Sequence, residues 1–280
     1  MTDRSTESSG TQVPWNLADL WELTTDRYPD REALVVGSQR VTYREIEERS
    51  NALAHVLADA GVGPGDHVAC YMQNCVEFVE TMLAAFKIRA VPLNVNYRYV
   101  HAELSHLLQD GDAVAVVFHR RFTDAMAEVA GDLDDLRISL VVDDIDPRAE
   151  PSQGDPVAFG AIDYTEAVGA ASTARDFGPR SGDGIYLMYT GGTTGMPKGV
   201  EWRMEDAVFA CVGGGDPMRL LGPVSSVDEL CDRILDDQVV VMACAPLIHA
   251  AAQWTSMSWW LCGGRMVLLP GSFDGAEVWR

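Results

Sequence analysis

The residues best suited to chemistry in this sequence lie between Thr190 and Gly199, which together hold four glycines, three threonines and one lysine. Glycine lets a backbone turn with positive φ and come close to a ligand, and successive exposed N–H groups form a concave site for an anion. Thr190, Thr193 and Thr194 add hydroxyl donors, while Lys198 adds a mobile positive charge suited to phosphate. This composition predicts a phosphate-binding loop.

The flanks of this loop support the same prediction. The apolar run Ile185–Tyr189 is typical of a buried strand that leads into the loop, and Pro197 stiffens the turn before the lysine. No Asp or Glu occurs from 184 to 200, although the chain carries 42 of them. A flexible surface loop would explain the glycines but neither the lysine nor the missing acids. A Walker motif is excluded, because it needs Gly before the Lys and Ser or Thr after it.

Composition limits the class of protein. A chain of 280 residues with 47% hydrophobic residues can bury a sizeable core. Its net charge of -21 argues against binding to nucleic acid or to an anionic membrane. The six cysteines form no CxxC pair, which favours reduced thiols in a cytoplasmic protein. Residues 1–14 are polar and are expected to be a disordered tail, and the apolar region 239–261 is interrupted too often for a transmembrane segment.

The order of apolar patterns predicts an α/β fold, because helical and strand-like segments alternate along the chain and such alternation is typical of parallel sheets. Expected strands are 33–36, 41–43, 67–72, 90–94, 113–118, 138–142, 185–189 and 266–269. Expected helices are 15–28, 43–60, 74–88, 101–109, 121–130, 205–212 and 227–235. Thr42 and Glu45 should form a capping box, and Asn74 should cap the third helix. Met266–Leu269 is expected to be an unpaired sheet edge.

A second segment that could contribute to a site is Ala245–His249, in which a histidine follows a proline by three positions. A lone histidine beside an apolar run is more often a core residue than a functional one. The apolar residues behind it, which include Trp254, also read as core on their own.

The loop resembles the signature of the adenylate-forming (AMP-binding) enzymes, Ser/Thr-Gly-Gly/Ser-Thr-Thr-Gly-x-Pro-Lys-Gly, and Thr190–Gly199 fits it at every position. The turn 61–66 and the strand 90–94 also have counterparts in that family. The segment 94–99 with Glu103-Leu104, together with 200–203, is similar to the actinobacterial fatty-acid and steroid-side-chain CoA ligases of the acyl-CoA synthetase branch.

The resemblance implies a large N-terminal domain with two mainly parallel sheets packed with helices. It implies ATP-dependent activation of a fatty or steroid side-chain acid to an acyl-adenylate, followed by thioester formation with coenzyme A. Lys198, Thr194 and His249 are then the expected catalytic residues, and His249 and Trp254 border the acyl pocket. Mg²⁺ would bridge phosphate oxygens without a protein ligand in this chain. The expected ATP-binding residues are Thr190, Gly191, Gly192, Thr193, Thr194, Gly195 and Lys198.

The resemblance covers residues 15–280 but only part of the family. The family's adenine-stacking motif, its ribose-binding Asp and its small C-terminal domain have no counterpart in these residues. The chain is therefore expected to be an N-terminal part, inactive on its own. A non-catalytic nucleotide-binding fragment, an amino- or aryl-acid domain feeding a carrier protein, and a homo-oligomer all stay open. The absence of acids from 250 to 273 favours a fatty or steroid acid over an amino acid.

Overall fold

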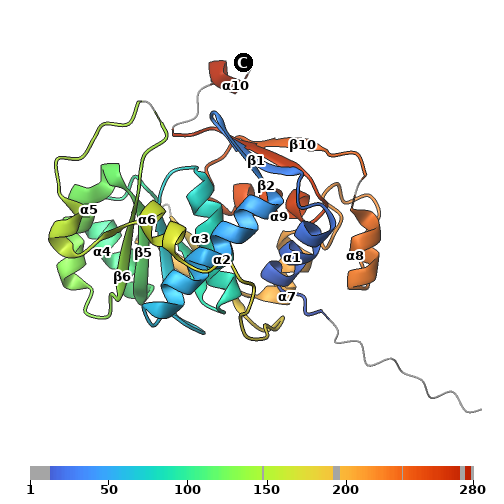
Figure 1. Cartoon of the computed structure of the whole chain (residues 1–280), viewed down its shortest axis with the longest axis horizontal. Helices are drawn as coiled ribbons and strands as arrows, with labels where there is room; N and C mark the ends of the chain where they lie inside the picture. Colours follow the sequence, from blue (N-terminus) through green and yellow to red (C-terminus); the bar gives the residue numbers. More distant parts are fainter. Residues whose placement is uncertain (1–12, 147, 192–195, 235, 272–274, 279–280) are drawn as a thin grey trace, which may run out of the picture.

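The computed structural model describes residues 13–146, 148–191, 196–234, 236–271 and 275–278. Figure 1 shows two sheets with a layer of helices between them. This inner layer contains α1 (Leu17–Arg27), α2 (Tyr43–Asp59), α3 (Val76–Lys87) and α9 (Ala250–Trp260). A hydrophobic cluster joins these helices to strands of both sheets. The prediction of two mainly parallel sheets packed with helices is confirmed.

The larger sheet has five parallel strands in the order β4-β3-β5-β6-β7. Its strands are β3 (His67–Tyr71), β4 (Val91–Asn94), β5 (Ala113–His119), β6 (Ile138–Val142) and β7 (Ile162–Asp163). The inner helix α3 joins β3 to β4, whereas α4 (His101–Asp110) and α5 (Thr123–Val129) pack on the outer face in a second hydrophobic cluster. The chain therefore changes faces after β4, and the carboxyl ends of β3 and β4 open at the same edge.

The smaller sheet has the order β10-β11-β1-β2. Its strands are β1 (Glu32–Val36), β2 (Gln39–Thr42), β10 (Val240–Ala243) and β11 (Arg265–Leu268). The expectation that 266–269 is an unpaired edge is wrong, because β11 pairs in parallel with β1 on one side and with β10 on the other. The strand β10, which the sequence pattern did not separate from its apolar surroundings, supplies the missing neighbour.

The predicted strand before the phosphate loop exists as β8 (Ile185–Thr190) and pairs antiparallel with β9 (Lys198–Arg203). This hairpin forms a two-stranded sheet of its own. Lys198 is therefore the first residue of a strand rather than part of the loop, and it lies opposite Thr190.

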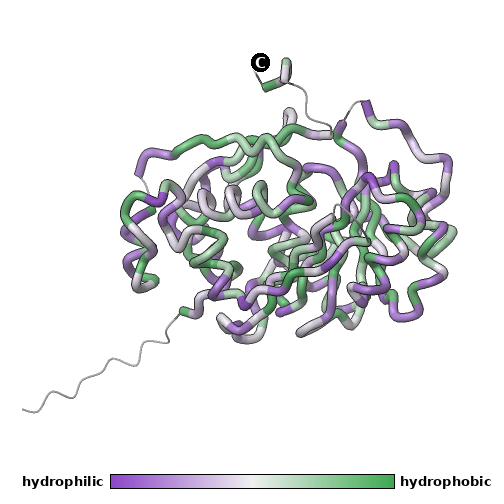
Figure 2. The backbone as a smooth tube through the Cα atoms, turned by 180° about the vertical axis from the view of Figure 1, so that it is seen from behind, coloured by the Kyte–Doolittle hydropathy of each residue, from purple (hydrophilic) through white to green (hydrophobic). Residues whose placement is uncertain are grey.

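The remaining helices are short and lie mostly in the connections. They are α6 (Tyr164–Ala170), α7 (Met204–Asp206), α8 (Val227–Arg233), α10 (Gly275–Val278) and the single turns η1 (Arg120–Phe122), η2 (Ala130–Asp132), η3 (Pro156–Phe159) and the π-helical η4 (Ala207–Cys211). In Figure 2 the long loop after β6 is largely hydrophilic, in keeping with its many acidic residues. Within the described ranges, no helix is both long and apolar enough to cross a bilayer.

Two helix starts show where local signals hold and where they fail. The capping box at α2 is confirmed, since Thr42 and Glu45 exchange side-chain and backbone hydrogen bonds. The predicted cap by Asn74 is wrong, because α3 begins after Cys75 without a side-chain cap. The Asn74 amide instead donates to Leu269 O and accepts from Leu247 N. The Asn74 side chain therefore forms tertiary hydrogen bonds instead of the helix cap that the local pattern predicts.

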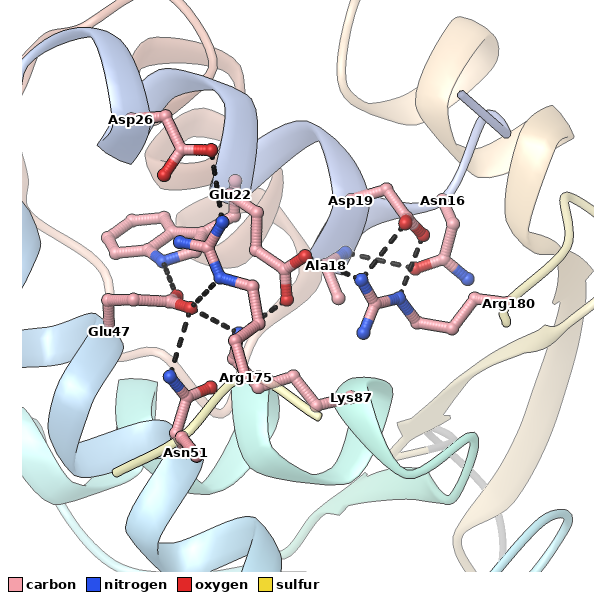
Figure 3. Close-up of polar contacts among 12 residues, drawn as sticks. Asn16, Ala18, Asp19, Glu22, Asp26, Glu47, Asn51, Lys87, Arg175 and Arg180 are labelled. Carbon is pink, nitrogen blue, oxygen red and sulfur yellow. Dashed lines mark hydrogen bonds and ion pairs between the residues drawn. The ribbon is translucent and has the colours of Figure 1, made fainter. Parts of the chain in front are cut away.

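Buried charges hold the inner helices together, and Figure 3 shows how they converge. The Lys87 side chain is fully buried, and its ammonium donates to Glu22 at 2.6 Å and to Glu47 at 2.8 Å. Arg175 also contacts Glu47, and Arg180 contacts Glu22 and Asp19. Burial alone would raise the pKa of Glu47, but the charges of Lys87 and Arg175 lower it below its ordinary value.

This ion cluster connects elements that are far apart in the sequence. Lys87 is the last residue of α3, Glu22 lies on α1 and Glu47 on α2, while Arg175 and Arg180 belong to the linker that leads into β8. Each buried carboxylate is thus paired with at least one cation, which is the condition under which buried charge is tolerated.

We expect Lys87→Met to destabilise the protein by about 3–5 kcal/mol, because it leaves two buried carboxylates without their shared cation. Arg44→Met is the matched control, since it breaks the ion pair of Arg44 with Asp30, whose side chains are 50% and 85% exposed. Such surface pairs contribute about 0–1 kcal/mol. Urea unfolding of the two variants measures the difference, and equal losses would contradict the role given to the cluster.

Candidate functional site

The phosphate-loop strand and the Pro-x-x-His segment meet at one cavity. This cavity has a volume of ≈ 360 Å³ and lies where the carboxyl end of β4 faces the end of β8 and the start of α9. It is lined by Asn94, Asn96, Tyr99, Tyr189, Thr190, Gly191, Ile248, His249 and Ala250. None of these lining residues is acidic, although the chain has a net charge of -21. The cavity is therefore suited to an anionic ligand.

Asn94 joins the three segments that form the cavity. Its buried amide nitrogen donates to Tyr189 O at 2.9 Å and to Ile248 O at 2.7 Å. Its amide oxygen accepts from Tyr189 N at 2.8 Å. The side chain thus exchanges both backbone hydrogen bonds with Tyr189, as a residue of a neighbouring strand would. In this way the last residue of β4 fixes the end of β8 although the two strands belong to different sheets.

Two more buried amides hold the segment before His249. Leu247 N donates to the Asn74 side chain, and Leu247 O accepts from the Gln253 side chain at 2.7 Å. Gln253 in turn accepts from the Tyr186 hydroxyl on β8 at 2.7 Å. A loop that crosses the inside of a protein has to pair its backbone groups, and here the side chains of Asn74, Asn94 and Gln253 do so. The position of His249 is set by these contacts.

Tyr189 anchors the other side of the cavity. Its hydroxyl donates to Asp110 at the end of α4, at 2.9 Å. Its ring covers Gly199 on the opposite strand, where a Cβ would lie 3.3 Å from two ring carbons and 3.0 Å from a Leu187 methyl group. A side chain at position 199 would therefore crowd the Tyr189 ring. This packing explains why glycine stands there without any contact between Gly199 and phosphate.

The predicted phosphate-binding residues are only partly described. Thr190 and Gly191 are exposed and line the cavity, and the exposed Lys198 stands opposite Thr190 in the hairpin. Among the described residues, no carboxylate lies within ion-pair distance of the Lys198 amine. Gly192, Thr193, Thr194 and Gly195 lie outside the described residues.

His249 lies at the mouth of the same cavity and precedes the first turn of α9. Its carbonyl accepts from Ala252 N and Gln253 N, so the backbone is part of the helix start. Burial and the positive charge of Arg98 both lower the pKa of His249 below its ordinary value. The imidazole is therefore neutral at pH 7 and can donate or accept one hydrogen bond without attracting an acid by charge.

Trp254 does not line this cavity. It lies one turn further along α9, with its ring 6.4 Å from the Trp202 ring of β9 in an edge-to-face contact. Asn94, Asn96 and Tyr99 do line the cavity, but the sequence analysis assigned them no role. Only their place at the end of a predicted parallel strand could have indicated them, because ligands bind beyond such ends.

We expect Asn94→Asp to destabilise the protein by about 1–3 kcal/mol or more. The new buried carboxylate cannot donate, so the carbonyl oxygens of Tyr189 and Ile248 lose their donor and face a negative charge. Asn96→Asp is the matched control: it adds the same charge to the same cavity but keeps the acceptor for Arg98 N. Urea unfolding combined with amide exchange at Tyr189 tests this. Equal exchange rates in both variants would show that the amide does not hold β8.

The AMP-binding enzyme family matches residues 21–280. A 3-oxocholest-4-en-26-oate–CoA ligase of Rhodococcus rhodochrous is 42% identical over 266 residues, which are 95% of this chain and 46% of the relative. A medium/long-chain-fatty-acid–CoA/3-oxocholest-4-en-26-oate–CoA ligase of Mycobacterium tuberculosis is 40% identical over 269 residues, 96% of this chain and 48% of the relative. The chain spans about half the length of the curated relatives it matches.

Solved structures agree on the fold. The anthranilate CoA ligase AuaEII, crystallised with anthranoyl-AMP, superposes with a TM-score of 0.79 at 21% identity, over 98% of this chain and 48% of that one. At this identity the likeness shows the fold alone. The family match extends over more than nine-tenths of the chain and the relatives cover nearly all of it, so the chain belongs to the family of AMP-binding enzymes.

Proposed function

We propose that this chain carries the phosphate-binding and acid-binding parts of an AMP-forming acyl-CoA ligase. Such an enzyme activates a carboxylic acid with ATP and then forms a thioester with coenzyme A. The observation that carries the proposal is the ≈ 360 Å³ cavity in which Thr190 and Gly191 face the His249 segment. One cavity can therefore hold the phosphates of a nucleotide beside a carboxylate.

The phosphate end of the cavity fits ATP. Thr190 and Gly191 are exposed and line the cavity, and the exposed Lys198 stands opposite Thr190. None of the described residues that line the cavity carries a carboxylate, so these groups can approach an anion. We assign Thr193 and Thr194 to the same task, together with Gly192 and Gly195, from the sequence signature alone. Mg²⁺, when bound, would offset the negative charge of the phosphates. The residues assigned to this end offer hydroxyls, backbone amides and one amine. These groups suit the phosphates rather than the metal, which prefers carboxylate and carbonyl oxygens.

The acid end is assigned to His249 and to the apolar start of α9. His249 is neutral at pH 7 because its pKa is lowered, so it shapes or gates the entry without holding the carboxylate by charge. Trp254 is assigned to the wall of the acyl pocket beyond it, with Trp202 as its support. Among the described residues of 250–271 there is no acidic side chain that could bind a substrate amine. This favours a fatty or steroid acid over an amino acid, as do the names of the relatives.

The first reaction step requires positioning more than side-chain chemistry. The acid oxygen attacks the α-phosphorus and pyrophosphate leaves, so negative charge grows on the leaving group. We assign Lys198 and the backbone amides of the sequence signature to offset that charge, because donors aimed in advance at developing charge are the usual source of large rate effects. No protein nucleophile is needed. The free cysteines, four of which are buried, fit a reducing compartment, and we infer that the protein is cytoplasmic.

The proposal is tested by acid-dependent pyrophosphate release from ATP, measured on this chain and on the longest reading frame that contains it. In whichever form turns over, Lys198→Ala should slow release ten- to a hundredfold, since a charge-assisted contact contributes roughly 1.5–3 kcal/mol. Lys198→Arg keeps the charge and should retain more of the rate. Release that is independent of any acid, or unchanged in Lys198→Ala, would count against the function.

A separate variant series tests the acid pocket. We expect His249→Ala and Trp254→Ala to change the preference among acids of different size more than the apparent affinity for ATP, because neither side chain is assigned to the phosphates. Ratios of kcat/KM for short-chain, long-chain and steroid acids measure this. If ATP affinity falls while the acid preference stays the same, the pocket has been placed wrongly.

A further inference from the structure

A second and larger cavity lies at the opposite end of β4 and β8. It has a volume of ≈ 530 Å³ and is lined by the first residues of these strands, Val91 and Ile185, and by residues 179–181 and 184 of the linker. The candidate active site is formed at the other ends of the same strands, by Asn94 and Thr190. Thr190 lies five positions after Ile185 in the same strand, which is roughly 16 Å. The two cavities are therefore distinct.

The second cavity has an apolar floor and a charged rim. Phe86, Val91 and Met204 are almost completely buried and form part of its wall. Arg89 is exposed and also lines it. A volume of this size lies within the range of small-molecule sites, which are mostly apolar with a few polar groups that fix orientation.

Arg89 has an unusual backbone for an arginine. It follows the last residues of α3 with φ of 64°, in the left-handed region that usually holds glycine at helix ends. A non-glycine residue costs about 1 kcal/mol or more there. The guanidinium lies beside the linker, where a Cβ on Gly178 would be 3.4 Å from its nitrogen. Within the described part of the chain the Arg89 side chain forms no hydrogen bond in exchange, so its packing within the protein does not explain its presence.

The carboxylates around this cavity are already paired with other arginines. Asp19 and Glu22 contact Arg180, as Figure 3 shows. Asp66 contacts Arg137, and Asp183 and Glu205 contact Arg203. Among the described residues, no acidic side chain lies within ion-pair distance of Arg89. In a chain of net charge -21, this guanidinium therefore lines the cavity without a carboxylate partner among the described residues.

We propose that this cavity binds an aliphatic carboxylate, with the carboxylate on Arg89 at the rim and the hydrocarbon chain on the apolar floor. A guanidinium holds a carboxylate through two parallel hydrogen bonds. One unpaired cation balances a singly charged carboxylate better than a doubly charged phosphate. The site is independent of the proposed ligase function, because it shares no lining residue with the cavity of His249.

The experiment titrates this chain with decanoate and, separately, with uncharged decanol, while recording the ¹³C-methyl signals of its methionines. Met204 lines the second cavity, and Met196 belongs to the segment 190–199 predicted as the phosphate loop. The Met204 signal is identified by its loss in Met204→Leu. We expect decanoate to shift the Met204 signal and to bind at least tenfold more tightly than decanol. A shift of Met196 alone would place the acid at the candidate active site and overturn the proposal.

Two arginine-to-glycine variants separate binding from folding. Arg89→Gly removes the guanidinium and places glycine where the backbone favours it, so the variant should fold. Arg219→Gly is the matched control, because Arg219 also has positive φ, at 53°, but does not line this cavity. We expect decanoate affinity at Met204 to fall ten- to a hundredfold in Arg89→Gly and to stay unchanged in Arg219→Gly. Unchanged affinity in Arg89→Gly, or equal loss in both, would overturn the proposal.

Discussion

The candidate site depends on the side-chain amide of Asn94. This amide forms hydrogen bonds with backbone groups of Tyr189 and Ile248 that no neighbouring strand satisfies. The strands β4 and β8 run past each other in separate sheets, and the loop before α9 approaches both. One buried amide exchanges two hydrogen bonds with Tyr189 and gives a third to Ile248. Because an unpaired backbone group is costly inside a protein, these three contacts determine how Thr190 and His249 face each other across the cavity.

The other end of β8 is held by charge. Arg175 and Arg180, on the linker before this strand, reach into the buried cluster around Lys87. Buried ion pairs add little net stability compared with an apolar core, but breaking one is costly, so they specify one arrangement strongly. The ions thus fix where the strand starts, and the amide of Asn94 fixes where it ends. Gly191, the first residue after the strand, is exposed, and neither anchor involves it.

Because the chain has an excess of acidic residues, a cation without a carboxylate partner is informative. Most described arginines contact a carboxylate, so a cation left without one stands out against a field that otherwise repels anions. Lys198 and Arg89 are both exposed, and they lie at opposite ends of β8 and β4. The first marks the proposed phosphate site and the second the proposed carboxylate site.

The sequence by itself determined the α/β class, the strand before the phosphate loop, the capping box of α2 and the family. These features rest on local signals: apolar period, turn residues and a ten-residue motif. It did not determine β9 or β10, because β9 is largely exposed without an apolar pattern and β10 is continuous with an apolar run. Nor did it determine the roles of Asn74 and Asn94, or the unpaired charge of Arg89. Only the tertiary structure decided these roles. The side chains of Asn74 and Asn94 bond backbone groups at least 95 residues away in the chain. The charge of Arg89 is left unpaired because the nearby carboxylates contact other arginines.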